Sequence, residues 1–444
     1  MTPENTRPSP PTPATPPTSR SPAPPWPAPF RHLVGLDWAS KEHVLCGVDE
    51  RGGIAWRLTI SNDLDGWAKL KTHFEKLGAA STIAVAVETN CGMVVEQLLN
   101  LGVSVYPIPP AGVKAYRERQ SGSGAKDDER DAYCLADALR TDGHRWRALH
   151  QDSEHVRQLR LLCRDEIHLI QKRTALYLEL RAALAECYPT VLEAFEDLTL
   201  VSLLDFLTTF PSAAELTRKG KKAWQKFLHT HRMAEPEAYQ RRLAVFATAA
   251  AWKVPAPVVQ AKTLLVAALA AQIRLLNLQL KNYGKQIEQV FETHQDAGLF
   301  ASLPGVGEKL GPRLLAFIGS NRERFDSAAS LQCYGGTAPV TRSSGKFRAV
   351  ARRLACDKDL SNTLFQMAEG SCATCTWAKV YRDSKQKHMG YPAAIRALAQ
   401  RWVKIIWKMW QTNQRYDEAE HTKNQVKHGS WVLALQPPAV PAAA

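Results

Sequence analysis

The sequence has little of what marks a membrane-spanning or a secreted protein. Its 444 residues contain no uninterrupted apolar run near the ~18 residues of a transmembrane helix. The first residues show no apolar h-region of a secretory signal. The nine cysteines are odd in number and scattered along the chain, which does not suit a framework of paired disulfides. We therefore expect a cytoplasmic protein in a reducing compartment, without a membrane partner.

Acidic residues are also in short supply. The chain has 57 Lys and Arg against 43 Asp and Glu, which gives a formal net charge of +14. This excess predicts an anionic partner, and nucleic acid fits it better than a membrane surface does. The hydrophobic share of 45% excludes a wholly disordered or collagen-like chain. Charge alone does not exclude an ordinary basic housekeeping protein.

The length favours two or three domains, at roughly 100–200 residues each. The prolines are unevenly spread, because 12 of the 27 lie in residues 1–30. We expect this segment to be a disordered, Pro-rich tail. Residues 431–444, which end in QPPAVPAAA, are expected to form a second, loose tail. Neither tail is predicted to carry the chemistry.

The pattern over residues 31–150 predicts an α/β domain. HLVGLDWASKEHVLCGVDERGGIAWRLTI is typical of three short strands, with a hairpin turn at DERGG. NDLDGWAKLKTHFEKL follows as an amphipathic helix and STIAVAVET as a buried strand. A further helix (CGMVVEQLLNLG) and strand (VSVYPIPP) complete a β-β-β-α-β-α-β order. This is the order of a ribonuclease-H-like domain, and other α/β folds also fit it.

Residues 151–296 are predicted to be a helical or coiled-coil region. Apolar residues recur at helical spacing over 150–190 and again over 258–296. Two such helices could pair as an antiparallel or an intermolecular coiled coil. A helical linker packed on its own domain fits the pattern equally well. Between them, 200–257 is expected to form a smaller helical insert, and 297–430 a mainly α C-terminal domain.

Four acids fall where the first domain could bring them together. Asp37 ends the first strand, in VGLDWASKEH, and Glu88 ends the buried strand, in IAVAVETN. Asp128 and Asp131 open the helix DERDAYCLADALR, where the i, i+3 spacing places them on one face. A carboxylate on an otherwise apolar strand needs a compensating partner. Oxygen ligands suit Mg²⁺ or Mn²⁺, and two such ions ~3.5–4 Å apart can hold a phosphodiester.

Each of these acids has a simpler explanation when it is taken alone. Asp37 could be a turn residue, and Asp128 or Asp131 could be an acid stabilised by the dipole at a helix N-terminus. The rival acids nearby are Asp49, Asp127 and Asp137. The combined placement on two strands and one helix is the more specific signal.

The stretch LPGVGEKLGPRLLAFIG, residues 303–319, resembles a helix-hairpin-helix turn. Gly305 and Gly307 would allow backbone N–H groups to approach a DNA phosphate at a helix N-terminus. A tight connection between two helices, without any ligand, explains these glycines equally well.

A basic segment without acids follows. From Ser327 through Cys356 the chain has no Asp or Glu, and Ser343 and Ser344 precede Gly345 in its middle. The five basic residues, which we predict to contact DNA, are Arg342, Lys346, Arg348, Arg352 and Arg353.

A serine hydroxyl among Arg and Lys side chains lacks the His base that acyl transfer uses. It suits attack on a phosphate, because cations lower the cost of the alkoxide and stabilise the charged transition state. A simpler explanation is a basic loop whose serines only donate hydrogen bonds to phosphate.

Taken in order, VGLDWASKEH, AVAVET, KDDERDA, LPGVG and YGGTAPVTRSSGK resemble the DEDD insertion-sequence transposases. This family includes the pilin-gene invertase and the bridge-RNA-guided recombinases. The resemblance implies a RuvC-like N-terminal domain, a coiled-coil region and a C-terminal transposase domain with a catalytic serine.

The resemblance also implies roles for single residues. Ser344 would be the nucleophile, with Ser343 as the alternative. The acids that bind Mg²⁺ or Mn²⁺ would be Asp37, Glu88, Asp128 and Asp131. The chain would be a site-specific DNA recombinase or transposase that forms a phosphoserine link to DNA. It would work as a homo-oligomer, a dimer or tetramer, with an active site shared between subunits and a structured guide RNA.

Two other functions fit the same residues. A metal-dependent RuvC-like nuclease acting on branched DNA would use water as the nucleophile, and Ser344 would only bind phosphate. A non-catalytic nucleic-acid-binding protein, such as a decayed transposase, would not cut DNA. A covalent protein–DNA adduct distinguishes the recombinase from both.

Overall fold

The computed structural model describes residues 26, 29–120, 127–149, 152–345 and 347–433. Most of both predicted tails, the SGSGAK segment at 121–126 and Lys346 lie outside the described residues. The chain divides into two compact units, Met1–Gln151 and Asp152–Ala444.

The first unit is built on a five-stranded sheet in the order β3-β2-β1-β4-β5. The strands are β1 (His32–Trp38), β2 (Glu42–Val48), β3 (Ile54–Ser61), β4 (Ile83–Val87) and β5 (Ser104–Pro107). The helices are α1 (Leu64–Leu77), α2 (Met93–Asn100), α3 (Pro110–Gln120) and α4 (Asp128–Asp142), with 3₁₀ turns η1 (Ala80–Thr82) and η2 (Gly143–Arg145). The first three strands are antiparallel, whereas β4 is parallel to β1 and β5 to β4. The predicted β-β-β-α-β-α-β order is confirmed.

The sequence explains why these elements form where they do. All five residues of β4 are buried, as expected for an apolar central strand. In α1, Leu70 and Phe74 lie one turn apart and are buried on the sheet. The Asp63 side chain accepts a hydrogen bond from the N–H of Gly66 and so caps the start of α1. The helix ends at Gly78, whose φ of 136° few other residues adopt.

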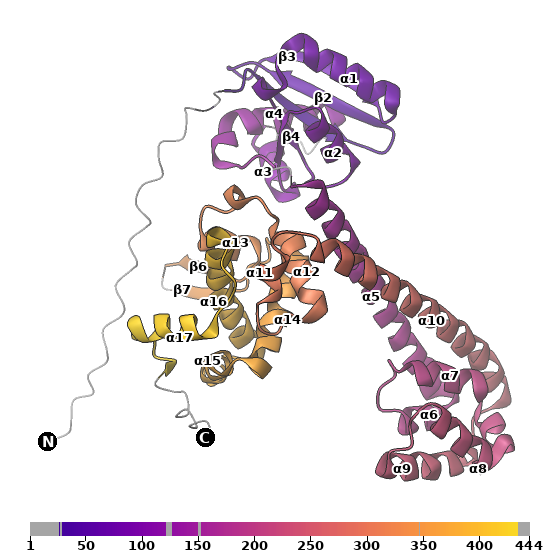
Figure 1. Cartoon of the computed structure of the whole chain (residues 1–444). Helices are drawn as coiled ribbons and strands as arrows, with labels where there is room; N and C mark the ends of the chain where they lie inside the picture. Colours follow the sequence, from indigo (N-terminus) through magenta and orange to yellow (C-terminus); the bar gives the residue numbers. More distant parts are fainter. Residues whose placement is uncertain (1–25, 27–28, 121–126, 150–151, 346, 434–444) are drawn as a thin grey trace. The chain divides into compact units, whose positions relative to one another are not determined.

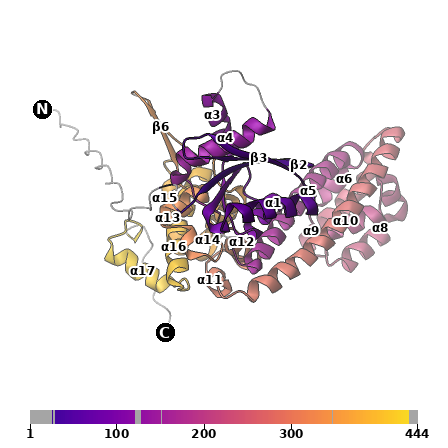
Figure 2. The same ribbon diagram turned by 90° about the horizontal axis from the view of Figure 1, so that it is seen from above.

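Helices cover both faces of the sheet. Residues of α1 and α2 belong to one apolar cluster with β1, β4 and β5, and α4 belongs to a second cluster on the opposite face. Figure 2 shows α1 and α4 on opposite sides of the strands. The middle strands are therefore buried on both faces, so side chains that leave the sheet for solvent do so at the strand ends.

The folded unit begins earlier than the boundary expected at residue 30. The Trp26 indole N–H donates to the carbonyl of Arg140 over 3.0 Å. The rings of Trp26 and Phe30 both contact Tyr106, with centroids 5.7 and 6.0 Å away. These two aromatics at the end of the Pro-rich segment belong to the first unit because its apolar surface buries them. The sequence assigned them to the tail only because prolines surround them.

The second unit begins with a long helical arm. Helices α5 (Glu154–Cys187) and α10 (Ala256–Glu292) run side by side in Figure 1. Lys262 pairs with Glu186 at 2.7 Å, and Arg173 donates to Asn277 over 3.0 Å. Because rising numbers on one helix meet falling numbers on the other, the pair is antiparallel. The predicted long helices are confirmed, and a coiled coil between subunits stays a prediction.

A small helical bundle closes one end of the arm, and it includes the helical insert predicted for 200–257. It contains α6 (Pro189–Ala194), α7 (Val201–Thr209), α8 (Ala213–Thr230), α9 (Pro236–Ala247) and the 3₁₀ turn η3 (Ala249–Ala251). Within the described residues, α10 alone is long and apolar enough to cross a membrane, by length and composition only. Its Leu269 and Ile273 pack in the core of this bundle, whereas other leucines of the helix, among them Leu264 and Leu275, are exposed.

The rest of the second unit is a mainly α domain. Its helices are α11 (Ala297–Ala301), α12 (Gly307–Ile318), α13 (Ala328–Tyr334), α14 (Lys358–Thr374), α15 (Thr376–Gln386), α16 (Tyr391–Thr412) and α17 (Glu418–Lys427), with the 3₁₀ turn η4 (Arg322–Arg324). Trp402 and Trp410 of α16 are fully buried in its core. Val432 is buried too, so the packed chain runs just past the boundary expected at 431.

One feature of this domain was not expected from the sequence. Strands β6 (Val340–Ser344) and β7 (Phe347–Ala351) form an isolated antiparallel hairpin. Most of its side chains are exposed on both faces, so VTRSS and FRAVA carry no alternation of apolar and polar residues. The turn after Ser344 opens with Gly345 at a φ of 54°, which suits a tight hairpin turn.

Candidate functional site

Two of the predicted acids are neighbours at one edge of the sheet. Strands β1 and β4 are parallel, and their register pairs Leu36 with Val87. Asp37 is the next residue of β1, and Glu88 directly follows the last residue of β4, so both lie where the buried run ends and partial exposure begins. Because the carboxyl ends of parallel strands meet at one edge, both carboxylates lie at the same edge, as expected.

Close packing brings α4 against β1. A Cβ atom at Gly35 would lie 2.0 Å from the carbonyl oxygen of Ala132 and 2.5 Å from the backbone nitrogen of Ala136. Only glycine permits this approach. Farther along α4, Arg140 lies beside Gly52, in the turn next to the start of β1. The helix therefore runs antiparallel to β1, and its N-terminal turn points toward the strand end that holds Asp37.

The first turn of α4 separates the two predicted aspartates. Asp127 caps the helix by accepting from the N–H of Arg130 over 2.8 Å. Asp128 is exposed, whereas Asp131 is only 3% exposed. Glu129 pairs with Arg57 of β3 at 2.6 Å and so holds the helix start on the sheet. Of the two, Asp131 has the burial expected of a functional acid, and the rival Asp127 is explained by capping.

Sequence reasoning missed the partner of this buried acid. Arg117 of α3 lies with its Nε 2.6 Å from Oδ1 of Asp131. Both atoms are buried, and the N–H is not aligned for a hydrogen bond, so the contact is an ion pair alone. It neutralises a carboxylate that burial would otherwise penalise. The sequence shows basic residues in YRERQ ahead of the acidic helix, but it does not show which acid Arg117 reaches.

Only some of the four predicted acids are placed to bind a hard cation. Within the described ranges, no group of three or more His, Cys, Asp or Glu side chains is placed to hold a metal ion. Asp37 and Glu88 offer oxygen ligands at one sheet edge, which suits Mg²⁺ or Mn²⁺. Asp131 is engaged by Arg117, so it would join them only if that ion pair opened.

The second predicted site lies on the β6–β7 hairpin. Ser344 is the last residue of β6, and both Ser343 and Ser344 are exposed. The register pairs Ser344 with Phe347 and Ser343 with Arg348. Because successive side chains on a strand point to opposite faces, Ser343 and Ser344 point apart.

This alternation divides the basic residues predicted to surround the serine. Arg342 lies two residues before Ser344 and shares its face. Arg348 lies on the face of Ser343 instead, and Lys346 lies outside the described residues. Phe347, whose exposed fraction is 63%, shares the face of Ser344 and was missed from the sequence. An aromatic residue between two basic ones was the available signal.

Comparison with known proteins now decides the family. Residues 34–189 match the DEDD_Tnp_IS110 model, described as a transposase, and residues 297–382 match the transposase model of the IS116/IS110/IS902 family. The "Mini-circle putative transposase for IS117" of Streptomyces coelicolor is 33% identical over 396 residues, which is 87% of this chain and 95% of the relative. The chain belongs to this transposase family.

More distant relatives align over a similar length. The 44.8 kDa protein of insertion element IS116 from Streptomyces clavuligerus is 25% identical over 88% of this chain and 97% of its own length. The 42 kDa protein of insertion element IS900 from Mycobacterium paratuberculosis is 25% identical over 88% of this chain and 98% of its own. Both candidate sites fall inside the matched regions, so this is an insertion-sequence transposase with DNA as its partner.

In this transposase the two glycines of the LPGVG turn have different surroundings. Gly305 has a φ of 78°, and a Cβ there would lie 2.4 Å from the backbone nitrogen of Ser371 in α14. Its close approach is therefore to another helix of the same domain. Gly307 opens α12 with a φ of 50° and has open space around it. A phosphate contact at Gly307 stays a prediction, whereas packing on α14 explains Gly305 without DNA.

Proposed function

We propose that this transposase is a site-specific DNA recombinase that cuts and rejoins DNA through Ser344. The observation that carries the proposal is the position of this serine on an exposed hairpin. Its hydroxyl is accessible, Gly345 beside it has no Cβ to obstruct a DNA backbone, and Arg342 shares its face. Family membership supplies DNA as the substrate.

In the proposed reaction the Ser344 Oγ forms a bond to phosphorus, and the bond from phosphorus to a deoxyribose oxygen breaks. The serine proton leaves the hydroxyl, and the released strand end gains one as a hydroxyl. A deoxyribose hydroxyl of the new partner strand then attacks the phosphoserine and regenerates the serine. Each phosphodiester bond is exchanged for another, so rejoining needs no nucleotide cofactor. The Arg342 guanidinium stabilises the extra negative charge on the phosphate oxygens.

The first unit serves the same reaction as a ribonuclease-H-like, RuvC-like domain. The strand order β3-β2-β1-β4-β5, with an antiparallel first half, supports this assignment. The proposed metal ligands are Asp37, Glu88, Asp128 and Asp131. A bound Mg²⁺ would supply positive charge for the reacting phosphate. The strands bring Asp37 and Glu88 to one edge, and Asp131 would join them if its ion pair with Arg117 opened.

The proposal extends to the partners. The net charge of +14 supports binding of a structured guide RNA as well as DNA. Cutting and rejoining several strands requires several serines, so we expect a homo-oligomer, a dimer or tetramer. The arm supports a coiled coil between subunits, because its helices expose several leucines. These are Leu161 and Leu178 of α5 and Leu264, Leu275 and Leu278 of α10.

The decisive experiment is a search for the covalent adduct. The full chain is incubated with Mg²⁺ and labelled duplex DNA carrying an end of its element, and the products are separated by denaturing electrophoresis. We expect labelled protein, and mass spectrometry should place the linked nucleotide on Ser344. Metal-dependent cleavage without any adduct would contradict the proposal and favour a nuclease that uses water.

A further inference from the structure

A small cavity with two arginines in its lining lies where the β6–β7 hairpin joins its domain. Its volume is about 230 Å³. Gly336 and Thr337 line it from the segment before β6, and Arg352 lines it just after β7. Side chains of α14 and α16 complete the wall. Four stretches of chain therefore meet around one small space.

The cavity carries uncompensated positive charge. Arg352 and Arg396 of α16 both line it, and no Asp or Glu does. Among the described residues, neither arginine makes a hydrogen bond or an ion pair. Burial, together with the nearby charge of Arg352, lowers the pKa of Arg396. Because these two cations face one cavity that contains no acidic side chain, an anion would bind there favourably.

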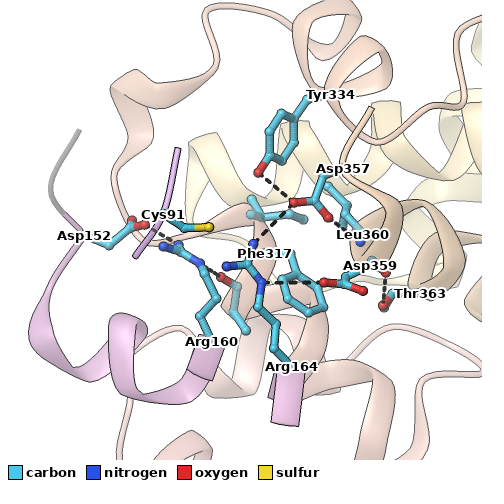
Figure 3. A network of polar contacts seen from close by, with 12 residues as sticks. Cys91, Asp152, Arg160, Arg164, Phe317, Tyr334, Asp357, Asp359, Leu360 and Thr363 are labelled. Carbon is cyan, nitrogen blue, oxygen red and sulfur yellow. Dashed lines mark hydrogen bonds and ion pairs between the residues drawn. The ribbon is translucent and has the colours of Figure 1, made fainter. Parts of the chain in front are cut away.

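The nearest acids in sequence are engaged elsewhere. Asp357 accepts from the N–H of Leu360 over 2.8 Å and so caps α14. Arg164 of α5 lies 3.7 Å from Asp357 and 3.5 Å from Asp359. Figure 3 shows these carboxylates turned toward Arg164, with Tyr334 donating to Asp357. They hold α14 on α5 and do not neutralise the cavity.

Neutral donors and apolar side chains share the rest of the lining, the apolar ones being Phe365, Pro392 and Ala399. Ser361 and Asn362, in the first turns of α14, contribute a hydroxyl and an amide. Gly336 has a φ of 68°, and a Cβ there would lie 2.6 Å from Cys356 Sγ and 3.1 Å from Ser361 Oγ. A residue with a side chain at position 336 would therefore overlap Cys356 and Ser361, whereas glycine fits.

We propose that this cavity binds one phosphate of the DNA backbone and so positions the DNA beside the hairpin; the assignment to DNA rests on the function proposed above. Planar guanidinium groups bind phosphate oxygens in pairs, and Ser361 and Asn362 add donors without charge. Cavities that hold drug-sized ligands measure roughly 300–1,000 Å³, so this smaller one suits a phosphate group better than a whole nucleotide.

The cavity is too far along the hairpin to take part in bond breaking. Arg352 follows the end of β7, whereas Ser344 ends the five-residue strand β6 at the other end of the hairpin. Five residues at ~3.3 Å each separate them by roughly 16 Å. The phosphate bound in the cavity is thus a different one from the phosphate that Ser344 attacks. Arg352 and Arg396 are therefore positioning residues.

The test measures binding of the full chain to a duplex DNA oligonucleotide over a series of salt concentrations, in EDTA so that no strand is cut. Arg396→Ala removes one cation, and Asn362→Asp places a negative charge in the cavity at almost unchanged size. We expect each to reduce the slope of log affinity against log salt by about 1. The matched controls, Lys404→Ala on α16 and Gln366→Glu on α14, change exposed residues outside the cavity lining and should keep the wild-type slope.

Arg396→Lys keeps the charge and should recover most of the slope but not all the affinity. Wild-type slopes in both Arg396→Ala and Asn362→Asp would overturn the proposal. So would a loss seen with single-stranded RNA but not with duplex DNA. Titration with inorganic phosphate separates a free anion from a backbone phosphate: phosphate binding that both variants lose while their DNA slopes stay unchanged would assign the cavity to a free anion. None of these readouts uses the serine adduct, so the two proposals fail independently.

Discussion

The acids of the first unit and the serine of the second are held in opposite ways. Asp37 and Glu88 extend from strands that are buried on both faces, and α4 is fixed against β1 at Gly35. Ser344 lies on a two-stranded hairpin that exposes most of its side chains. Isolated two-stranded ribbons are marginally stable. The fold therefore fixes the strand ends that carry Asp37 and Glu88, whereas little packing holds the hairpin that carries Ser344.

The largest effect is expected from the nucleophile. Ser344→Ala should keep DNA binding but lose cleavage and adduct by at least about 10³-fold, because no other hydroxyl shares its place on the strand. Denaturing electrophoresis measures both products. Ser343→Ala is the matched control, and we expect it to keep partial activity because its side chain points to the other face. An adduct mapped to Ser343 would transfer the role to that residue.

The next effect concerns the acids. Asp37→Asn or Asp131→Asn should reduce recombination by roughly 10²–10³-fold and weaken Mg²⁺ binding, since a hard dication needs carboxylate charge. The control is Asp49→Asn, because Asp49 only accepts backbone N–H groups in the turn after β2. Recombination assays with and without EDTA measure the effect. Full activity in EDTA, or in Asp37→Asn, would remove the acids from the mechanism.

The sequence was sufficient to predict the fold wherever burial left a periodic pattern. The order of strands and helices from β1 to β5, the two long helices and the helical insert between them were correct, whereas α3 (Pro110–Gln120) was not predicted. These elements bury one face or both, so the spacing of their apolar residues predicts whether each is a helix or a strand. The β6–β7 hairpin buries almost none of its side chains, so its sequence has no periodic apolar pattern from which the strands could be predicted.

The sequence predicted which residues belong to the candidate sites, but it did not predict which of them contact one another. Asp37 and Glu88 were expected at one sheet edge because strand ends of equal direction must meet there. No pattern in a single sequence shows that Arg117 reaches Asp131, or that Arg352 and Arg396 line one cavity. Such pairs form between distant elements and depend on how helices pack. The separation of Arg342 from Arg348 needed the strand register.

A smaller effect contrasts glycines in the two regions. Gly35→Ala should destabilise the first unit by roughly 3 kcal/mol, because the new Cβ would overlap the backbone of α4. Gly345→Ala should cost only ~1–2 kcal/mol within the hairpin, from its positive φ, since no atom lies nearby. Hydrogen exchange measured by mass spectrometry should become faster in β1 and α4 of the Gly35→Ala variant. In the Gly345→Ala variant, exchange should be unchanged everywhere outside the hairpin.

The control for this pair is Gly284→Ala, inside α10, where a Cβ meets open space. Alanine is the better helix former, so exchange in α10 should slow slightly. Unchanged exchange in Gly35→Ala would show that α4 can move away from β1, and the contrast between a fixed and an exposed site would then fail.

The smallest effect tests the two faces of the hairpin. Arg348→Ala should lower the slope of log affinity against log salt by about 1, through the loss of one phosphate contact. Because Arg348 lies on the face of Ser343, cleavage at saturating DNA should stay near the wild-type rate. Arg342→Ala should lower both the slope and that rate, since Arg342 shares the face of Ser344. Equal rate losses in the two variants would show that the DNA contacts both faces at the reacting phosphate, and an unchanged slope in Arg348→Ala would show that this side chain faces solvent in the complex.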